Sequence, residues 1–230
     1  MTGDASVPDA AATDITASAP VPAAAAAVFG PALPAAVAFA DILATRGVEQ
    51  GMIGPHEAAR LWDRHLLNCA VVAELVDQRC QTLVDIGSGA GLPGLVLAMV
   101  LPGVSMTLLE PMERRCRFLA ECVTELDLAN VTVLRGRAEE AAVKAAVRAD
   151  VVTARAVAPL PRLAELAAGL VRPGGMVLAI KGRSAVEELK EAGPVLRRIG
   201  ARSAEVVHAG QGKVVPATTV VRFFARRGRA

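Results

Sequence analysis

The chain has 230 residues, of which 53% are apolar and 21% charged, the profile of a globular protein with a sizeable core. No apolar run reaches the roughly 18 residues that a membrane-spanning helix needs, so the sequence predicts a protein that does not cross a membrane. The net charge is +2, but all 25 Lys and Arg lie from Arg46 onward, which gives residues 46–230 a basic excess that permits an anionic partner without requiring one.

Residues 1–28 are mostly Ala, Pro, Ser, Thr and Asp and show no periodic Leu or Ile, which predicts a disordered tail. The tail has neither the basic start of a signal peptide nor the arginines of a transit peptide, so we expect a cytoplasmic protein. The four cysteines form no CxxC pair, and no His stands at zinc-ligand spacing. We therefore predict no metal site and free thiols in a reducing cytosol.

Two helices are expected next. Residues 33–46 form a short amphipathic pattern, and a longer helix is predicted from Pro55 to about Leu75, where Pro55 suits the first turn. Its apolar face recurs at three- and four-residue spacing and consists of Ala58, Leu61, Trp62, His65, Leu66, Cys69 and Val72.

From Thr82 onward, short apolar runs alternate with helical stretches, which predicts a parallel sheet with helices on both faces. The expected strands are 82–86, 105–109, 131–134, 150–153 and 176–180. The expected helices are 92–100, 113–127, 137–147, 160–171 and 184–198. Gly174-Gly175 is predicted to turn into the fifth strand, and residues 203–207 and 218–224 are predicted to form a terminal hairpin.

A glycine-rich loop follows the first of these strands, in the sequence Asp85-Ile86-Gly87-Ser88-Gly89-Ala90-Gly91-Leu92-Pro93-Gly94. A strand, a glycine-rich turn and a helix together form a binding site for an adenosine-containing ligand. A dinucleotide site favours the spacing G-x-G-x-x-G, whereas here the first three glycines are spaced G-x-G-x-G. The spacing favours S-adenosylmethionine, which carries no phosphate.

Two acids strengthen this interpretation. Asp85 precedes the first glycine by two residues, where a carboxylate suits a cationic cofactor either by direct contact or by bracing the loop. Glu110 follows the second strand, where it is expected to accept hydrogen bonds from both ribose hydroxyls. We therefore predict that S-adenosylmethionine binds this chain and that NAD does not.

The loop resembles the signature of the RsmG family, also called GidB, whose members methylate N7 of one guanine in bacterial 16S ribosomal RNA. Five further segments match this family in order, over about residues 29–228. They are Asp63-Arg64-His65-Leu66-Leu67-Asn68, then Leu108-Leu109-Glu110 with Arg114-Arg115-Cys116-Arg117-Phe118-Leu119, then Gly136-Arg137-Ala138-Glu139-Glu140, Ala154-Arg155-Ala156 and Ala179-Ile180-Lys181-Gly182. Asn68 departs from the Asp of many members, and we assign it no role.

The resemblance implies an α/β fold, the class I methyltransferase (Rossmann-like) sheet of seven strands in the order 3-2-1-4-5-7-6, with strand seven antiparallel. It implies an N-terminal helical segment over residues 29–80, packed on a methyltransferase domain over residues 81–230. It also implies further cofactor-binding residues in addition to Asp85 and Glu110. These are Gly87, Gly89, Gly91, Leu92, Ala138, Glu139 and Arg155.

The residue pattern agrees with methylation of guanine N7. The chain has neither the D/N-P-P-Y/F/W motif of amine methylation after the fourth strand nor a Pro-Cys nucleophile. Guanine N7 has an exposed lone pair, so no general base is needed and catalysis consists of positioning. The expected catalytic residues are Arg155, whose fork-shaped guanidinium could hold a phosphate or guanine O6, together with Lys181 and His65.

The expected partner is 16S rRNA or the small ribosomal subunit, with no protein partner implied. Arg114, Arg115, Arg117 and Lys181 are the candidate RNA contacts, and Arg226, Arg227 and Arg229 form a second basic cluster. The chain has no Tyr and one Trp, which favours recognition of a structured RNA over base stacking. A methyltransferase acting on another RNA or on a small molecule is the alternative. A non-catalytic binding module and a nicotinamide dehydrogenase fit less well.

Overall fold

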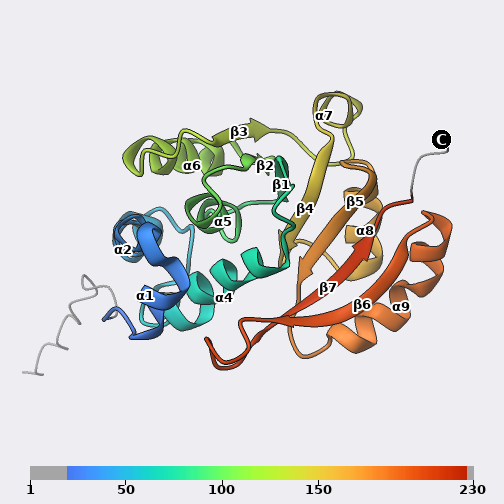
Figure 1. Cartoon of the computed structure of the whole chain (residues 1–230). Coiled ribbons are helices and arrows are strands. Elements are labelled where there is room, and N and C mark those ends of the chain that lie inside the picture. Colours follow the sequence, from blue (N-terminus) through green and yellow to red (C-terminus); the bar gives the residue numbers. More distant parts are fainter. Residues whose placement is uncertain (1–19, 227–230) are drawn as a thin grey trace, which may run out of the picture.

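Seven strands form one sheet in the order β3-β2-β1-β4-β5-β7-β6 in this computed structural model, which describes residues 20–226 (Figure 1). The pairs β5–β7 and β6–β7 are antiparallel and the other four pairs are parallel. The predicted strand order is therefore confirmed. The strands are β1 (Thr82–Ile86), β2 (Ser105–Glu110), β3 (Val131–Arg135), β4 (Ala149–Arg155), β5 (Val171–Ile180), β6 (Arg202–Ala209) and β7 (Thr218–Phe224).

The register of the central strands brings their carboxyl ends to one edge of the sheet. Ile86 of β1 pairs with Leu109 of β2 and with Ala154 of β4, and Arg155 pairs with Ile180 of β5. Ligands of open α/β sheets bind at this edge.

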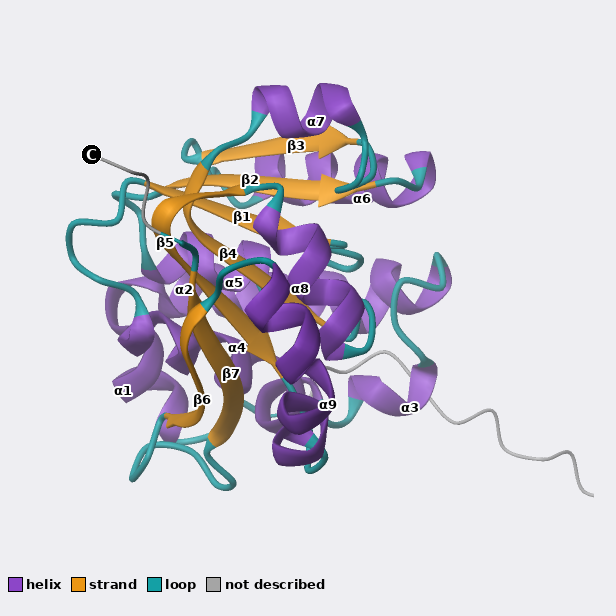
Figure 2. Ribbon diagram, turned by 90° about the vertical axis from the view of Figure 1, so that its right-hand side faces the viewer, coloured by secondary structure: helices purple, strands orange, loops and turns teal. Residues whose placement is uncertain are grey.

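Helices cover both faces, as expected. On one face lie α5 (Gly94–Val100) and α6 (Glu113–Glu125), and on the other lie α7 (Ala141–Ala146), α8 (Leu160–Ala168) and α9 (Ala185–Arg198). Figure 2 shows α8 and α9 in front of the strands and α5 behind them. Six of the seven residues of α5 are buried, which explains why this helix is apolar all round.

One predicted turn is wrong. Gly174-Gly175 lies inside β5, which begins at Val171 and pairs with β4 from Ala149, with a register shift before Val151. A Cβ added at Gly175 would stand 2.7 Å from the Asp150 carbonyl oxygen. These glycines therefore allow the two backbones to approach at a bulge, and they do not start the strand.

The helical N-terminal segment begins earlier than predicted. α1 (Ala24–Phe29) lies partly within residues 1–28, the predicted tail, and is followed by a 3-10 turn, α2 (Leu33–Ile42) and a π-helical turn, η2 (Leu43–Gly47). Alanine has the highest helix propensity, and the helix buries Ala25 and Phe29 against the domain. The boundary at residue 28 is therefore wrong, and residues 1–19 lie outside the described residues.

The helical run Ala24–Gly47 is long and apolar enough, by length and composition alone, to cross a membrane, so the expectation that no run reaches this length was wrong. Pro31 and Pro34 divide the run in the sequence, but the structure continues through them as helix. Phe39 and Leu43 are fully buried in the core that this run shares with α5. Its apolar face is therefore covered by the domain.

The helix predicted from Pro55 to Leu75 is broken into four short pieces. They are α3 (Pro55–Ala58), the π-helical η3 (Leu61–Leu66), α4 (Leu67–Ala70) and the 3-10 helix η4 (Val71–Leu75). The predicted apolar face is confirmed, because Trp62, His65, Cys69 and Val72 are all buried. His65, within η3, contacts Arg155 at the end of β4.

Candidate active site

The glycine-rich loop connects β1 to α5 at the carboxyl edge of the sheet. Gly87, Gly89 and Gly91 all have φ between 57° and 93°, a region that favours glycine. A Cβ at Gly87 would stand 2.9 Å from Val157, whereas a Cβ at Gly89 would meet no side chain within 4 Å. The backbone at Gly89 therefore remains open to a ligand.

Asp85 lies beneath the loop and is fully buried. Its Oδ2 accepts a hydrogen bond from the Gly94 backbone N–H at 3.0 Å, and its Oδ1 has no hydrogen-bond partner among residues 20–226. Burial raises the pKa of the Asp85 carboxyl to about 7. Of the two roles considered for Asp85, this geometry supports bracing the loop.

Asp85→Asn should flatten the pH dependence of stability. The folded pKa lies above the unfolded value near 3.8, so between about pH 4 and pH 7 the folded state holds a proton that the unfolded chain has lost. Stability of the wild type should therefore fall as the pH rises through this window, and Asn cannot contribute to that fall. Urea unfolding between pH 4.5 and pH 8 measures it, with the exposed Asp41→Asn as control. Equal slopes in the two variants would refute the effect.

Glu110 ends β2 and is also buried. Its Oε2 accepts from the Gly89 backbone N–H at 3.0 Å, and its Oε1 accepts from the Met112 backbone N–H at 3.0 Å. Glu110 therefore holds the middle of the loop to the end of β2. Each carboxylate oxygen retains a further lone pair for a ligand hydroxyl.

Two hollows flank the loop and meet at Gly87. The Ala138 hollow, about 250 Å³, is lined by Ile86, Gly87, Leu109, Pro111, Gly136, Arg137, Ala138, Glu139, Val157, Ala158, Arg162 and Leu166. The Arg155 hollow, about 290 Å³, is lined by Met52, Ile53, Gly54, Glu57, His65, Gly87, Ser88, Gly89, Ala90, Leu92 and Arg155. Of the predicted residues near the loop, Ala138 and Glu139 line the first hollow, Gly89, Leu92, His65 and Arg155 line the second, and Gly87 lines both. Asp85, Gly91 and Glu110 line neither.

Arg155 is held by neutral acceptors. Its Nη1 donates to Cys69 Sγ at 3.3 Å, and its Nη2 faces Nδ1 of His65. Burial raises the pKa of the Cys69 thiol to about 11, so Cys69 is uncharged at neutral pH. Arg155 forms no ion pair with a carboxylate of the described residues, so its charge remains available to an anionic ligand.

Lys181 lies apart from this cluster. Its Nζ donates to Glu188 Oε2 at 2.7 Å and to the Ala158 carbonyl oxygen at 2.9 Å, in a separate hollow next to Ala156 and Pro159. The prediction grouped Lys181 with His65 and Arg155. The structure does not bring it to them, because Glu188 of α9 holds the ammonium group.

The arginines at the start of α6 line neither hollow. Nη2 of Arg117 lies 3.6 Å from Oε1 of Glu113, and Arg114 is exposed. Nε of Arg115 is buried without a hydrogen-bond partner in the described part of the chain. Their assignment to RNA binding stays a prediction.

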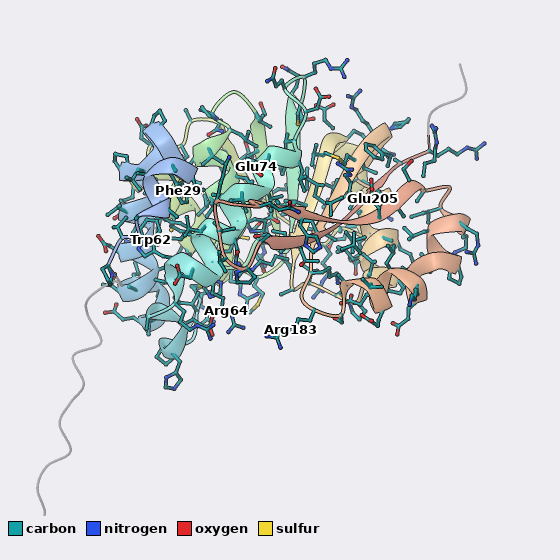
Figure 3. All side chains as sticks on the ribbon, turned by 60° about the horizontal axis from the view of Figure 1, so that its bottom comes forward. Phe29, Trp62, Arg64, Glu74, Arg183 and Glu205 are labelled. Carbon is teal, nitrogen blue, oxygen red and sulfur yellow. The ribbon has the colours of Figure 1, made fainter. Side chains whose placement is uncertain are left out.

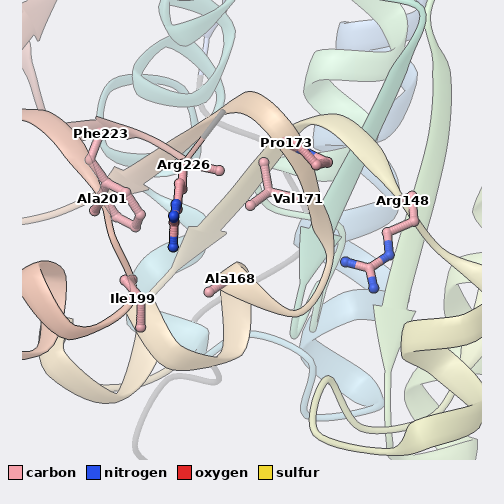
Figure 4. A pocket seen from close by; sticks show the side chains of 9 residues that line it. Arg148, Ala168, Val171, Pro173, Ile199, Ala201, Phe223 and Arg226 are labelled. Carbon is pink, nitrogen blue, oxygen red and sulfur yellow. The ribbon is translucent and has the colours of Figure 1, made fainter. Parts of the chain in front are cut away.

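Other cavities lie at the opposite, amino-terminal edge of the sheet. One of about 160 Å³ is lined by Val171, Phe223 and Arg226, with Arg148 at its margin (Figure 4). A groove of about 630 Å³ contains Arg79, Arg172 and other residues near the start of β1. Arg226 of the predicted second basic cluster lines the first cavity, while Arg227 and Arg229 lie outside the described residues. None of the predicted cofactor-binding or catalytic residues lines either cavity.

Sequence reasoning missed two side chains that contact His65 and Arg155. Glu57 Oε2 lies 2.6 Å from His65 Nε2, and Cys69 accepts from Arg155. Glu57 stands eight residues before His65, across the break between α3 and η3, so no helical spacing indicated the contact. Cys69 was placed on the apolar face, where a buried thiol has an ordinary packing role.

Comparisons with known proteins agree with the geometry. Residues 32–215 match the family described as "GidB: rRNA small subunit methyltransferase G". Among similar proteins, the ribosomal RNA small subunit methyltransferase G of Thermobifida fusca is 56% identical over 85% of this chain and 81% of its own. The ribosomal RNA small subunit methyltransferase G of Streptomyces coelicolor is 53% identical over 88% of this chain and 84% of its own.

Solved structures with low identity share the fold. The mitomycin 7-O-methyltransferase MmcR superposes with a TM-score of 0.56 at 20% identity, over 81% of this chain and 60% of its own. An O-methyltransferase family protein from Burkholderia thailandensis superposes with a TM-score of 0.54 at 18% identity, over 84% and 63%.

Proposed function

The chain belongs to the rRNA small subunit methyltransferase G family, and on that premise we propose that it transfers a methyl group from S-adenosylmethionine to N7 of a single guanine in 16S ribosomal RNA. The observation that carries the proposal is the Arg155 hollow, where an arginine without a carboxylate partner in residues 20–226 stands beside the glycine loop. Such a cation suits a polyanionic substrate.

The residues around the loop fit S-adenosylmethionine. The open backbone at Gly89 admits a ligand, and Glu110 beside it keeps lone pairs for ribose hydroxyls. Gly87, Gly91 and Leu92 would shape the loop around the cofactor, and Ala138 and Glu139 would bound the adenine in the Ala138 hollow. The bound cofactor would supply a methyl group on a sulfonium.

The chain's own residues then position the guanine. N7 carries an in-plane lone pair, so no group has to remove a proton from the substrate. This fits His65, whose two ring nitrogens are already engaged by Glu57 and Arg155. We propose that Arg155 orients the guanine or an adjacent phosphate and that His65 supports Arg155. Lys181 would act at the border of the site, next to its own hollow.

The cofactor assignment has a direct binding test. Glu110→Ala should weaken S-adenosylmethionine binding by about 1–3 kcal/mol, the cost of removing a charge-assisted acceptor. Isothermal titration calorimetry measures it, with the exposed Glu187→Ala as control and NAD as a second ligand. Wild-type protein that binds NAD and not S-adenosylmethionine would overturn the assignment.

Methyl transfer tests the function as a whole. Tritiated S-adenosylmethionine is incubated with the chain and either small ribosomal subunits, naked 16S rRNA or a pool of small metabolites, and the modified base is mapped. We expect the label at N7 of one guanine in rRNA. We also propose that the enzyme is cytoplasmic and needs no protein partner. Label in the metabolite pool alone would favour the small-molecule alternative, and label in a different RNA would change the substrate.

A further inference from the structure

Among residues 20–226, Glu57 is the one carboxylate that lines the Arg155 hollow, and it contacts His65 directly. Its Oε2 lies 2.6 Å from His65 Nε2 and 3.3 Å from Arg64 Nε. The hydrogen bond from His65 lowers the pKa of Glu57, so this carboxyl is ionised at neutral pH and can only accept. Nε2 of His65 must therefore carry a proton.

The other side of the imidazole ring gives the same answer independently. Nδ1 of His65 faces Nη2 of Arg155, and a guanidinium has N–H donors and no acceptor. Nδ1 must therefore present its lone pair. Burial and the Arg155 charge lower the pKa of His65, which keeps the ring neutral. A single tautomer, protonated at Nε2 alone, satisfies both neighbours.

We propose that Glu57 is a positioning residue for methyl transfer, which fixes the Nε2–H tautomer of His65 so that Nδ1 holds the Arg155 guanidinium in the hollow. This role rests on the proposed function for its catalytic consequence. Without Glu57, the tautomer with the proton on Nδ1 becomes accessible, and it points an N–H at Arg155. The Arg155 guanidinium then loses Nδ1 of His65 as a hydrogen-bond acceptor and moves away from the glycine loop.

Nuclear magnetic resonance tests the tautomer without the reaction. Long-range ¹⁵N–¹H spectra of the ¹⁵N-labelled full chain distinguish the two neutral tautomers, and a His65→Gln sample assigns the ring among the three histidines. We expect Nε2–H alone in the wild type, a mixture in Glu57→Ala, and Nε2–H retained in Glu57→Gln, whose amide oxygen can still accept. Nδ1–H in the wild type would overturn the proposal.

Kinetics test the consequence. Glu57→Ala should lower kcat by about 10-fold or more while leaving KM for S-adenosylmethionine nearly unchanged, on the scale seen when the outer partner of a functional histidine is removed. Glu57→Gln should recover most of kcat. The control is Glu49→Ala, an exposed acid in the neighbouring segment. A kcat for Glu57→Ala equal to that of Glu49→Ala would contradict the role.

The pH profile separates positioning from simple loss of structure. The charged and titratable groups around His65 are Glu57, Arg64, Cys69 and Arg155. As the pH falls, Nδ1 of His65 gains a proton, and its N–H then faces the N–H groups of Arg155 with no acceptor between them. The rate of methyl transfer should therefore drop, with the midpoint of the pH–rate profile below pH 6.5. Because Glu57 raises the pKa of His65, Glu57→Gln should move that midpoint to lower pH. An unchanged midpoint would refute the coupling.

The two proposals can fail separately. If the wild type shows the Nε2–H tautomer but transfers no methyl group to rRNA, the proposed function fails and the Glu57 contact stands. If rRNA is methylated but the tautomer is Nδ1–H, the proposed function stands and the role of Glu57 is withdrawn.

Discussion

Arg155→Ala is expected to reduce methyl transfer to rRNA about 100-fold or more, the scale associated with misplaced reacting groups, while leaving the protein folded. Arg155 ends β4 beside the glycine loop, and its guanidinium is held by Cys69 and His65. Since none of its contacts with the described residues is an ion pair with a carboxylate, its removal leaves no unpaired acid. The loss should therefore appear in the reaction and not in stability.

Arg155→Lys should not restore the rate fully. An ammonium group has no planar fork and cannot donate to Cys69, to His65 and to a substrate with one fixed geometry. The assay is tritium transfer to small ribosomal subunits, with thermal unfolding in parallel. Arg202→Ala, at an exposed position on β6, is the control for loss of one positive charge. Near-normal transfer by folded Arg155→Ala would remove Arg155 from the site.

Phe29→Ala is expected to lower the free energy of unfolding by about 3–5 kcal/mol, the range for deleting a buried aromatic side chain. Phe29 ends α1, is 3% exposed, and meets Trp62 edge to face with ring centroids 6.0 Å apart (Figure 3). Because Trp62 and His65 share η3, this contact also anchors the segment that carries the histidine of the Arg155 hollow.

Urea unfolding measures the effect of Phe29→Ala. Phe29→Leu should cost less, since an apolar side chain still fills most of the space. The control is Val21→Ala, because Val21 lies in the same terminal segment and is 45% exposed. A free energy of unfolding equal to that of the control would show that α1 does not contribute to the core, as the prediction of a tail through residue 28 implied.

The sequence alone located the glycine loop and the strands, apart from the start of β5 at Val171, and its resemblance to a known family implied the order of the sheet. These features depend on short-range patterns, such as apolar runs, glycines that need positive φ, and motifs of the matching family. Gly87, Gly89 and Gly91 were located correctly for this reason, and so was the convergence of Asp85, Glu110 and Arg155 at one edge.

The tertiary structure decided which side chains meet. His65 and Arg155 are 90 residues apart, and their contact depends on how the π-helical turn η3 packs against the end of β4. The same packing places Glu57 in contact with His65. Glu188 of α9 instead binds Lys181, which keeps that lysine away from His65 and Arg155. A local sequence pattern predicts the secondary structure and burial of a residue. The hydrogen-bond partner of a polar side chain, however, often lies in a segment distant in the chain. Only the packed fold brings such segments together.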